Sequence, residues 1–173
     1  MIYLKDNAIG VDKKINFCMQ KINSLNTVKD WNIDIFHRIY RERREDVYLP
    51  YRFVSGKEYK EAFLNDKTNG EVGFYLNNNR TTEGIAEVDC DIIFSLNLDK
   101  LDNGSLQRED ERAIMMAFEA VEGFTKVLEV KTELRNVFSE FDTERIKFRD
   151  MQPFLNFSFL VNFNYVNNNC YDM

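Results

Sequence analysis

Apolar and polar residues alternate most regularly between Ala86 and Leu98. Every second position from Ala86 onward is apolar, and the positions between are mostly polar: Glu87, Asp89, Asp91, Ile93, Ser95 and Asn97. Successive side chains of a β-strand point to opposite faces of a sheet, so strict alternation is the pattern of a strand with one buried face. We therefore expect a long central strand from Ala86 to Leu98, against which the other elements pack or pair.

A second alternating stretch, from Trp31 to Arg41, predicts one arm of a hairpin. Its expected inward face carries Trp31, Ile33, Ile35, His37 and Ile39. An unbroken run of charged residues follows from Arg41 to Asp46, and alternation returns from Leu49 to Phe53. This pattern indicates a long hairpin with a charged tip. Because proline cannot donate to a strand ladder, Pro50 predicts that the second arm is an edge strand or an interrupted one.

Two further stretches complete the expected sheet. Val72 to Leu76 predicts a short strand that pairs antiparallel with the central strand through a polar loop at Asn77–Gly84. Leu155 to Tyr165 alternates again and predicts the last strand.

Two segments have weaker patterns. The spacing of Tyr59, Ala62 and Phe63 indicates a short helix. The segment from Thr132 to Ile146 fits either a helix face or a strand, and we favour a strand around Leu134–Phe141.

Two segments have the period of an amphipathic helix. They are Val11–Leu25, with one apolar stripe, and Ala113–Leu128, with a broader one. Helices and strands in this order predict an α+β domain that spans residues 1–173, in which a mostly antiparallel sheet carries the two main helices on one face. We expect residues 1–10 to form an extended arm and residues 166–173 a mobile tail.

Composition narrows the classes of function. The net charge of −6 argues against general nucleic-acid binding, for which a basic surface supplies most of the affinity. No apolar run is long enough for a transmembrane helix, and Lys5 and Asp6 interrupt any signal-peptide core. The cysteines Cys18, Cys90 and Cys170 are widely spaced and odd in number, which is typical of reduced thiols in a chain made in a cytoplasm.

The candidates for chemistry each have a simpler interpretation. His37, the only histidine, continues an apolar row and is expected to be a satisfied, half-buried residue. Glu87, Asp89 and Asp91 share one strand face and could bind a hard cation or act as an acid–base pair. A solvated outer face, or one answered by basic residues across the strand, explains the same row without chemistry.

Motifs of known catalytic sites are missing from the sequence. There is no glycine-rich phosphate loop, no nucleophile elbow and no dinucleotide fingerprint. Cys18 and Cys90 fall on rows expected to be buried, where thiols serve as small core residues. We therefore expect no catalytic residue, no metal site and no cofactor, and an enzyme is the minority hypothesis.

The charged hairpin tip is the best candidate for an interaction site. Arg41, Arg43 and Arg44 form its basic cluster, and the acids between them leave the tip nearly neutral. Mixed charges suit a specific protein surface, where complementary charges determine register and partner, although a solvated loop would have the same composition. The expected subunit or partner interface consists of Arg41, Glu42, Arg43, Arg44, Glu45, Asn78 and Arg80.

The order of these elements resembles that of tail-terminator and head-to-tail connector proteins of tailed bacteriophages. The segments that carry the resemblance are Val11–Leu25, Trp31–Phe53, Ala86–Leu98, Ala113–Leu128 and Leu155–Tyr165. The run of Asn and Phe at its end is similar to virion proteins of phages with AT-rich hosts, such as the crAss-like phages that infect the Bacteroides group.

The resemblance implies a non-enzymatic virion protein that forms a homo-oligomeric ring at the neck or tail. Such a ring joins the portal or head to the tail and lines the channel through which DNA passes without specific binding. Its implied partners are neighbouring portal, neck or tail proteins and no membrane, with synthesis in the host cytoplasm. The alternative is a small-molecule-binding or hydrolytic α+β domain of the host cytoplasm, against which the apolar inward rows count.

Overall fold

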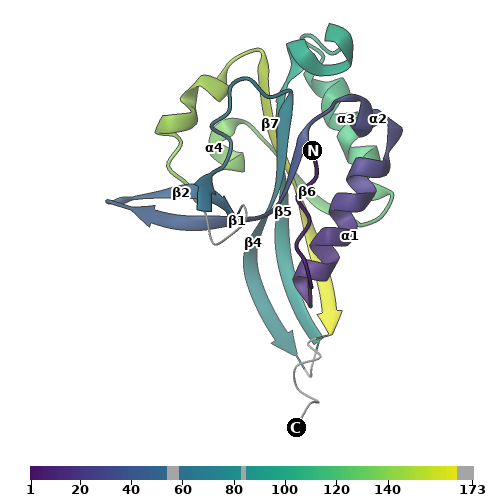
Figure 1. Cartoon of the computed structure of the whole chain (residues 1–173), viewed down its shortest axis with the longest axis vertical. Coiled ribbons are helices and arrows are strands. Elements are labelled where there is room, and N and C mark those ends of the chain that lie inside the picture. Colours follow the sequence, from purple (N-terminus) through teal and green to yellow (C-terminus); the bar gives the residue numbers. More distant parts are fainter. Residues whose placement is uncertain (54–58, 83–84, 167–173) are drawn as a thin grey trace.

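The computed structural model describes residues 1–53, 59–82 and 85–166, which form a seven-stranded sheet with helical segments on both faces (Figure 1). The strands are β1 (Asp34–Arg44), β2 (Val47–Phe53), β3 (Tyr59–Glu61), β4 (Gly70–Thr82), β5 (Ile85–Asn97), β6 (Val127–Thr132) and β7 (Phe154–Val166). The helices are α1 (Val11–Ser24), α2 (Asn26–Asp30), α3 (Asp110–Glu122) and α4 (Leu134–Val137), and the 3₁₀ segments are η1 (Leu98–Gly104) and η2 (Glu144–Asp150).

The strand order is β3-β2-β1-β4-β5-β7-β6. Within the described residues, β1 and β4 run parallel and the other neighbouring strands run antiparallel. The predicted α+β fold with a mostly antiparallel sheet is therefore confirmed. No helix in the described part of the chain has the length and apolarity needed to cross a membrane.

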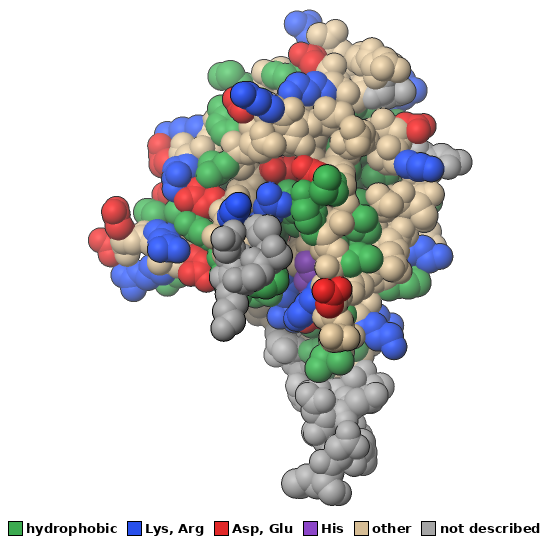
Figure 2. All heavy atoms as spheres, in the orientation of Figure 1, with side chains coloured by type: hydrophobic (Ala, Val, Ile, Leu, Met, Phe, Trp, Pro, Cys, Tyr) green, Lys and Arg blue, Asp and Glu red, His purple; other side chains and the backbone are tan. Residues whose placement is uncertain are grey.

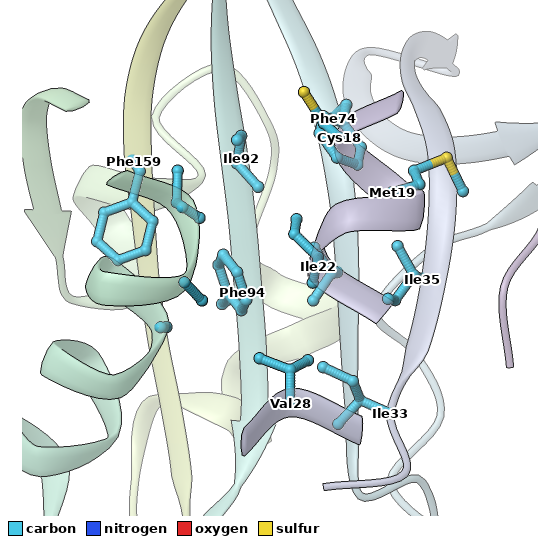
Figure 3. Packing of buried hydrophobic residues seen from close by; sticks show 14 of the residues in the cluster. Cys18, Met19, Ile22, Val28, Ile33, Ile35, Phe74, Ile92, Phe94 and Phe159 are labelled. Atoms are coloured by element: carbon cyan, nitrogen blue, oxygen red, sulfur yellow. The ribbon is translucent and has the colours of Figure 1, made fainter. Parts of the chain in front are cut away.

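The predicted central strand is β5, which pairs along its length with β4 on one side and β7 on the other. Its apolar row is buried against the helical layer that contains α1 and α3. In that core the rings of Phe94 and Phe157 stack with centroids 4.9 Å apart. Figure 3 shows Cys18, Met19 and Ile22 of α1 beside residues of β1, β4 and β5.

The opposite face of the sheet carries α4 and η2, which the sequence interpretation missed. Leu134, Val137, Phe138 and Phe141 are buried there in a second core with Phe36 and other residues of the sheet. The strand favoured for Leu134–Phe141 is wrong: α4 occupies its first half and no strand its second. These four apolar residues follow a spacing of three, four and seven, which is the helical repeat.

Strand β1 changes the face of its side chains at an irregularity between Ile35 and Arg38. The prediction that Ile39 shares the inward face of Ile33 and Ile35 is therefore wrong. Ile33 and Ile35 lie in the core under α1, whereas Ile39 lies with Phe36 in the second core. An extra residue in one strand reverses the alternation, so a strict period of two cannot hold across a bulge.

The loop expected at Asn77–Gly84 is also wrong in its described part. Strand β4 continues to Thr82 across a register shift between Leu76 and Asn79, and Thr82 pairs with Ile85. The antiparallel pairing of this strand with the central strand is confirmed. The backbone of this part of β4 continues the ladder with β5 as far as the pair of Thr82 and Ile85.

Two smaller expectations also need correction, and a third holds in part. The short helix at Tyr59–Phe63 is the strand β3, which pairs with Tyr51–Phe53 of β2. Pro50 does not interrupt β2, but β3 pairs with β2 only from Tyr51 on, so the part of β2 before Tyr51 lies at the edge of the β-ladder; the Pro50 carbonyl accepts a hydrogen bond from the amide of Ala62 at 2.8 Å. Helix α3 ends at Glu122, so the last part of the predicted stripe belongs to β6.

The N-terminal arm lies against the body of the protein. Ile2 forms a parallel bridge with Ile35, and the Tyr3 amide donates to the Ile35 carbonyl at 3.0 Å. Lys5 contacts the carboxylate of Asp12 at the start of α1. The arm is therefore bound to its own domain in this structure. The tail expected at residues 166–173 lies, from 167 on, outside the described residues.

Candidate functional site

The predicted charged hairpin is an arm that extends beyond the main sheet. The ladder between β1 and β4 ends at Ile39, whereas the ladder between β1 and β2 continues to the pair of Arg44 and Val47. Strand β3 pairs with β2 only from Tyr51 to Phe53. The distal part of the hairpin is therefore two-stranded, and it projects to the left in Figure 1.

The arginines of the arm have different environments. Arg41 at its root lies 3.0 Å from Glu140 and over the ring of Tyr48, 3.8 Å from the ring centroid. Arg43 lies 3.2 Å from Asp46 in a strongly exposed pair. Figure 2 shows basic and acidic side chains side by side on this projection. Exposed pairs of this kind contribute little to stability, so the tip charges remain available to a partner.

The remaining predicted interface residues divide into two groups. Glu42 is half-buried, and Glu45 occupies the exposed turn with a φ of 55°. Asn78 lies on β4 and lines the same cleft as Arg41, so the structure brings these two residues together. The backbone of Arg80 belongs to β4, and its side chain lies outside what the structure describes.

A polar cleft of about 530 Å³ lies on the face of the sheet that carries α4. It is bordered by β1, β4, β5, β6, β7 and the segment that follows α4. The cleft is lined by Arg41, Tyr75, Asn77, Asn78, Asp89, Asp91, Lys131, Val137, Ser139, Glu140, Phe141 and Leu160. Sequence reasoning did not place Lys131, Ser139 or Glu140 at a site.

Asp91 is the most buried charged residue of this cleft, with 4% of its surface exposed. Lys131 Nζ lies 3.0 and 3.1 Å from its two carboxylate oxygens. Asn77 donates to Asp91 at 2.7 Å and Ser158 donates at 3.3 Å. At Asp91 the charge of the acidic row is thus paired with a basic residue across the sheet. This agrees with the simpler interpretation in which basic residues across the strand neutralise the row.

The other two acids of that row are in different surroundings. Asp89 is half-buried and accepts a hydrogen bond from Asn162 Nδ2 at 2.8 Å, whereas Glu87 is exposed. Within the described residues, no group of three or more His, Cys, Asp or Glu side chains is placed to hold a metal ion. At Asp91 the countercharge is the ammonium of Lys131.

The other candidates for chemistry are buried. Burial raises the pKa of the Cys18 thiol to about 12, and burial also raises the pKa of Cys90 well above its ordinary value. His37 Nε2 lies 3.3 Å from the Asp12 carbonyl, and burial lowers the pKa of this histidine. In the cleft, burial and the nearby Glu140 raise the pKa of Tyr75. Cys18 and Cys90 are therefore protonated thiols, and thiolates are the reactive form.

Comparison of this chain with protein-family models, with curated proteins and with solved structures finds no match. The fold and the geometry of the chain itself are therefore the basis for assigning a function.

Proposed function

We propose that this protein is a non-enzymatic subunit of a ring at the neck or tail of a tailed bacteriophage. In this role it contacts its neighbours through the β1–β2 arm, joins the portal or head to the tail, and borders the channel for DNA. The observation that carries the proposal is the two-stranded arm with its mixed-charge tip.

The physical argument concerns the stability of such an arm. A two-stranded ribbon is at best marginally stable in water when no other surface covers it. Beyond Ile39 the arm has β1–β2 pairing, and part of β2 is covered: Leu49 and Tyr51 are buried, and the Asp142 amide donates to the Tyr48 carbonyl at 2.6 Å. A neighbouring subunit that covers the exposed tip would stabilise this two-stranded projection.

The acidic balance of the chain is compatible with a DNA channel. The net charge of −6 disfavours adhesion to a phosphate backbone, and DNA must pass through a neck or tail without stopping. A cyclic ring also needs two different complementary patches on each subunit, so that one patch meets the other on the next copy.

Peptide mass spectrometry on gradient-purified phage particles tests this function. We expect the chain in intact particles at a constant, low multiple of the portal protein. Absence from particles, together with abundance in the infected cell, would contradict the proposal. DNA-free particles from the same gradient provide the control for chains that adhere to DNA.

The polar cleft favours a second candidate, a domain that binds a small polar molecule. Its volume of about 530 Å³ is within the range of ligand pockets, and polar side chains converge in it. A thermal-shift screen of polar metabolites tests this candidate: a rise of several degrees that is lost in Asn77→Leu would support it. No shift with any metabolite would count against it.

A further inference from the structure

The outer edge of β6 is an open template for another strand. β6 stands at the end of the strand order and pairs with β7 on its inner side. The Val127 amide donates to Glu122 of the same chain at 2.7 Å, and the Thr132 carbonyl accepts from Asn136 at 3.0 Å. Between these two ends, the only backbone hydrogen bonds that reach residues 128–131 from other described segments are those of the ladder with β7.

The side chains of β6 protect this edge only in part: Glu129 is exposed, and Lys131 is paired with Asp91 on the sheet. Leu128 and Val130 are large apolar residues with 53% and 43% of their surfaces exposed. The register irregularity of the strand lies between Val127 and Glu129, so the remainder pairs regularly with β7. Soluble proteins usually cover or blunt such edges with proline, charges or another segment. An exposed apolar edge of regular register therefore indicates a strand partner.

The arm of the same chain provides a second open edge. Past Ile39, strand β1 has no strand partner among the described residues on the side away from β2, because its ladder with β4 has ended. The outer edge of β2 is closed, since the Tyr48 and Pro50 carbonyls already accept bonds from Asp142 and Ala62. The free edge of the arm is therefore residues 40–44 of β1.

The two edges are complementary on the face of the sheet that carries the cleft. On β1, Arg41 lies on this face, and Arg43, two residues on, shares it. On β6, Glu129 is opposite Leu160, which also lines the cleft, so Glu129 shares this face as well. Arg43 and Glu129 are both exposed, with opposite charges.

On the opposite face each edge offers one apolar side chain, Val130 on β6 and Tyr40 on β1, the latter beside the charged Glu42 and Arg44. Val130 pairs with Phe159, whose ring lies in the core beneath α3. Tyr40 of the arm faces away from the cleft, and the exposed Val47 is paired with Arg44 on that same side. A pairing that keeps the cleft faces of the two strands on one side brings Arg43 near Glu129 and Tyr40 near Val130.

We propose that the free edge of β1 in the arm, residues 40–44, pairs with the outer edge of β6 in a second copy of this chain. The contact extends the sheet from one subunit to the next and places Arg43 beside Glu129 of the neighbour. It is heterologous, because each copy offers one arm and one edge, and a heterologous contact builds a ring when the rotation between copies closes. The inference rests on the proposed ring function and identifies the two patches that such a ring requires.

Charge exchange between the two edges is the first test. Sedimentation velocity of the full chain, from micromolar concentrations to about 1 mM, measures self-association. We expect Arg43→Glu and Glu129→Arg each to weaken it about tenfold, and the double variant to recover most of that loss. Failure of the double variant to recover, or a wild-type chain that stays monomeric throughout this range, would overturn the proposal.

Mixing of variants tests the heterologous geometry. Val130→Lys leaves the arm intact and blocks the edge, whereas Arg43→Glu leaves the edge intact and weakens the arm. Each variant alone should associate more weakly than the wild type. An equimolar mixture should give mainly one-to-one dimers, because the Val130→Lys chain keeps an intact arm and the Arg43→Glu chain keeps an intact edge. Met151→Lys, at a site that is 68% exposed and far along the chain from both edges, is the matched control and should associate as the wild type does.

The two proposals can fail separately. A chain that is present in particles, and whose Val130→Lys variant is incorporated equally well, would retain the ring function and overturn the edge contact. A chain that is absent from particles, and whose self-association responds to the variants as described, would retain the edge contact and overturn the virion role.

Discussion

At the scale of single residues, buried charge ties the second layer to the sheet. Arg149 of η2 is fully buried and donates to Ser95 Oγ at 2.8 Å, to the Asn65 carbonyl at 2.7 Å and to Glu71 at 3.2 Å. Asn156 donates to the Arg149 carbonyl at 2.6 Å. Because buried charges are costly unless they are paired and hydrogen-bonded, this network specifies where η2 lies on the sheet.

Glu71 gives this network a pH dependence. Burial raises the pKa of Glu71 from 4.5 to about 7, against the opposing effect of Arg149. The folded state therefore binds a proton that the unfolded state releases, and stability falls as the pH rises between about 4.5 and about 7. Relative to Glu71→Gln, we expect the wild type to lose about 3 kcal/mol across this interval.

Urea unfolding of the two proteins at a series of pH values measures this difference. The comparison with Glu71→Gln removes the contribution of every other titrating group, which both proteins share. Parallel stability curves for the two proteins would show that Glu71 titrates in the folded state as it does in the unfolded chain.

A second prediction at this scale concerns the ion pair of the cleft. Lys131→Met leaves the buried carboxylate of Asp91 without its countercharge, and we expect a loss of about 2 kcal/mol in the free energy of unfolding. Asp91→Asn combined with Lys131→Met removes both charges and should be more stable than the single variant. Urea denaturation measures both, and a double variant less stable than the single one would contradict the argument.

At the scale of elements, the contact between β1 and β4 depends on a missing side chain. A Cβ at Gly73 would lie 2.6 Å from two side-chain carbons of Ile39, which is closer than any real packing contact. Ile39 occupies this space because the irregularity in β1 turns it toward the second core. The irregularity in β1 turns Ile39 toward β4, and the absence of a side chain at Gly73 leaves the space that Ile39 fills.

This contact predicts the effect of one methyl group. Gly73→Ala overpacks the sheet against Ile39 and should lower the free energy of unfolding by about 2 kcal/mol. Gly123→Ala is the matched control, because its added Cβ would meet nothing closer than 3.4 Å. Thermal or urea unfolding compares the two, and equal effects would show that the sheet adapts without cost.

At the scale of the whole molecule, the arm is separable from the two cores. Both buried clusters are built from residues outside the arm's distal part. Among the described residues, Arg41 contacts Glu140, Arg44 lies over the ring of Tyr51, and the Asp142 amide donates to the Tyr48 carbonyl. Folding should therefore tolerate changes at the tip that assembly does not. Ring formation depends on complementary charges that face a neighbour, and such charges decide partner and register more than stability.

The corresponding variant replaces Arg41, Arg43 and Arg44 by serine. We expect its free energy of unfolding to stay within about 1 kcal/mol of the wild type, because the lost ion pairs are exposed. Assembly into rings should be lost, as measured by negative-stain electron microscopy or by incorporation into particles. Intact rings from this variant would contradict the role of the arm.

Much of the fold follows from side-chain pattern alone. The alternation around Ala86–Leu98 and Leu155–Tyr165 and the period of Val11–Leu25 predict β5, β7 and α1 within a residue or two. One buried face imposes a strict repeat on each of these segments, and that repeat is readable without the partner. The same reasoning predicts the hairpin and its charged tip, because a charged run between two alternating stretches has few other structures.

Tertiary contacts decided the rest. Pairing with a neighbouring strand decides β3, the polar half of β4 and the reversed direction of Ile39. Backbone hydrogen bonds between strands impose no repeating side-chain pattern on either segment, so the sequence does not reveal them. The cleft combines residues from β1 to β7, so its ion pair between Asp91 and Lys131 has no local signature. The sequence by itself determined which segments have one buried face, because burial acts locally on side chains. Only the tertiary structure decided which polar residues meet and which edges stay open, because those depend on neighbours far away in the chain.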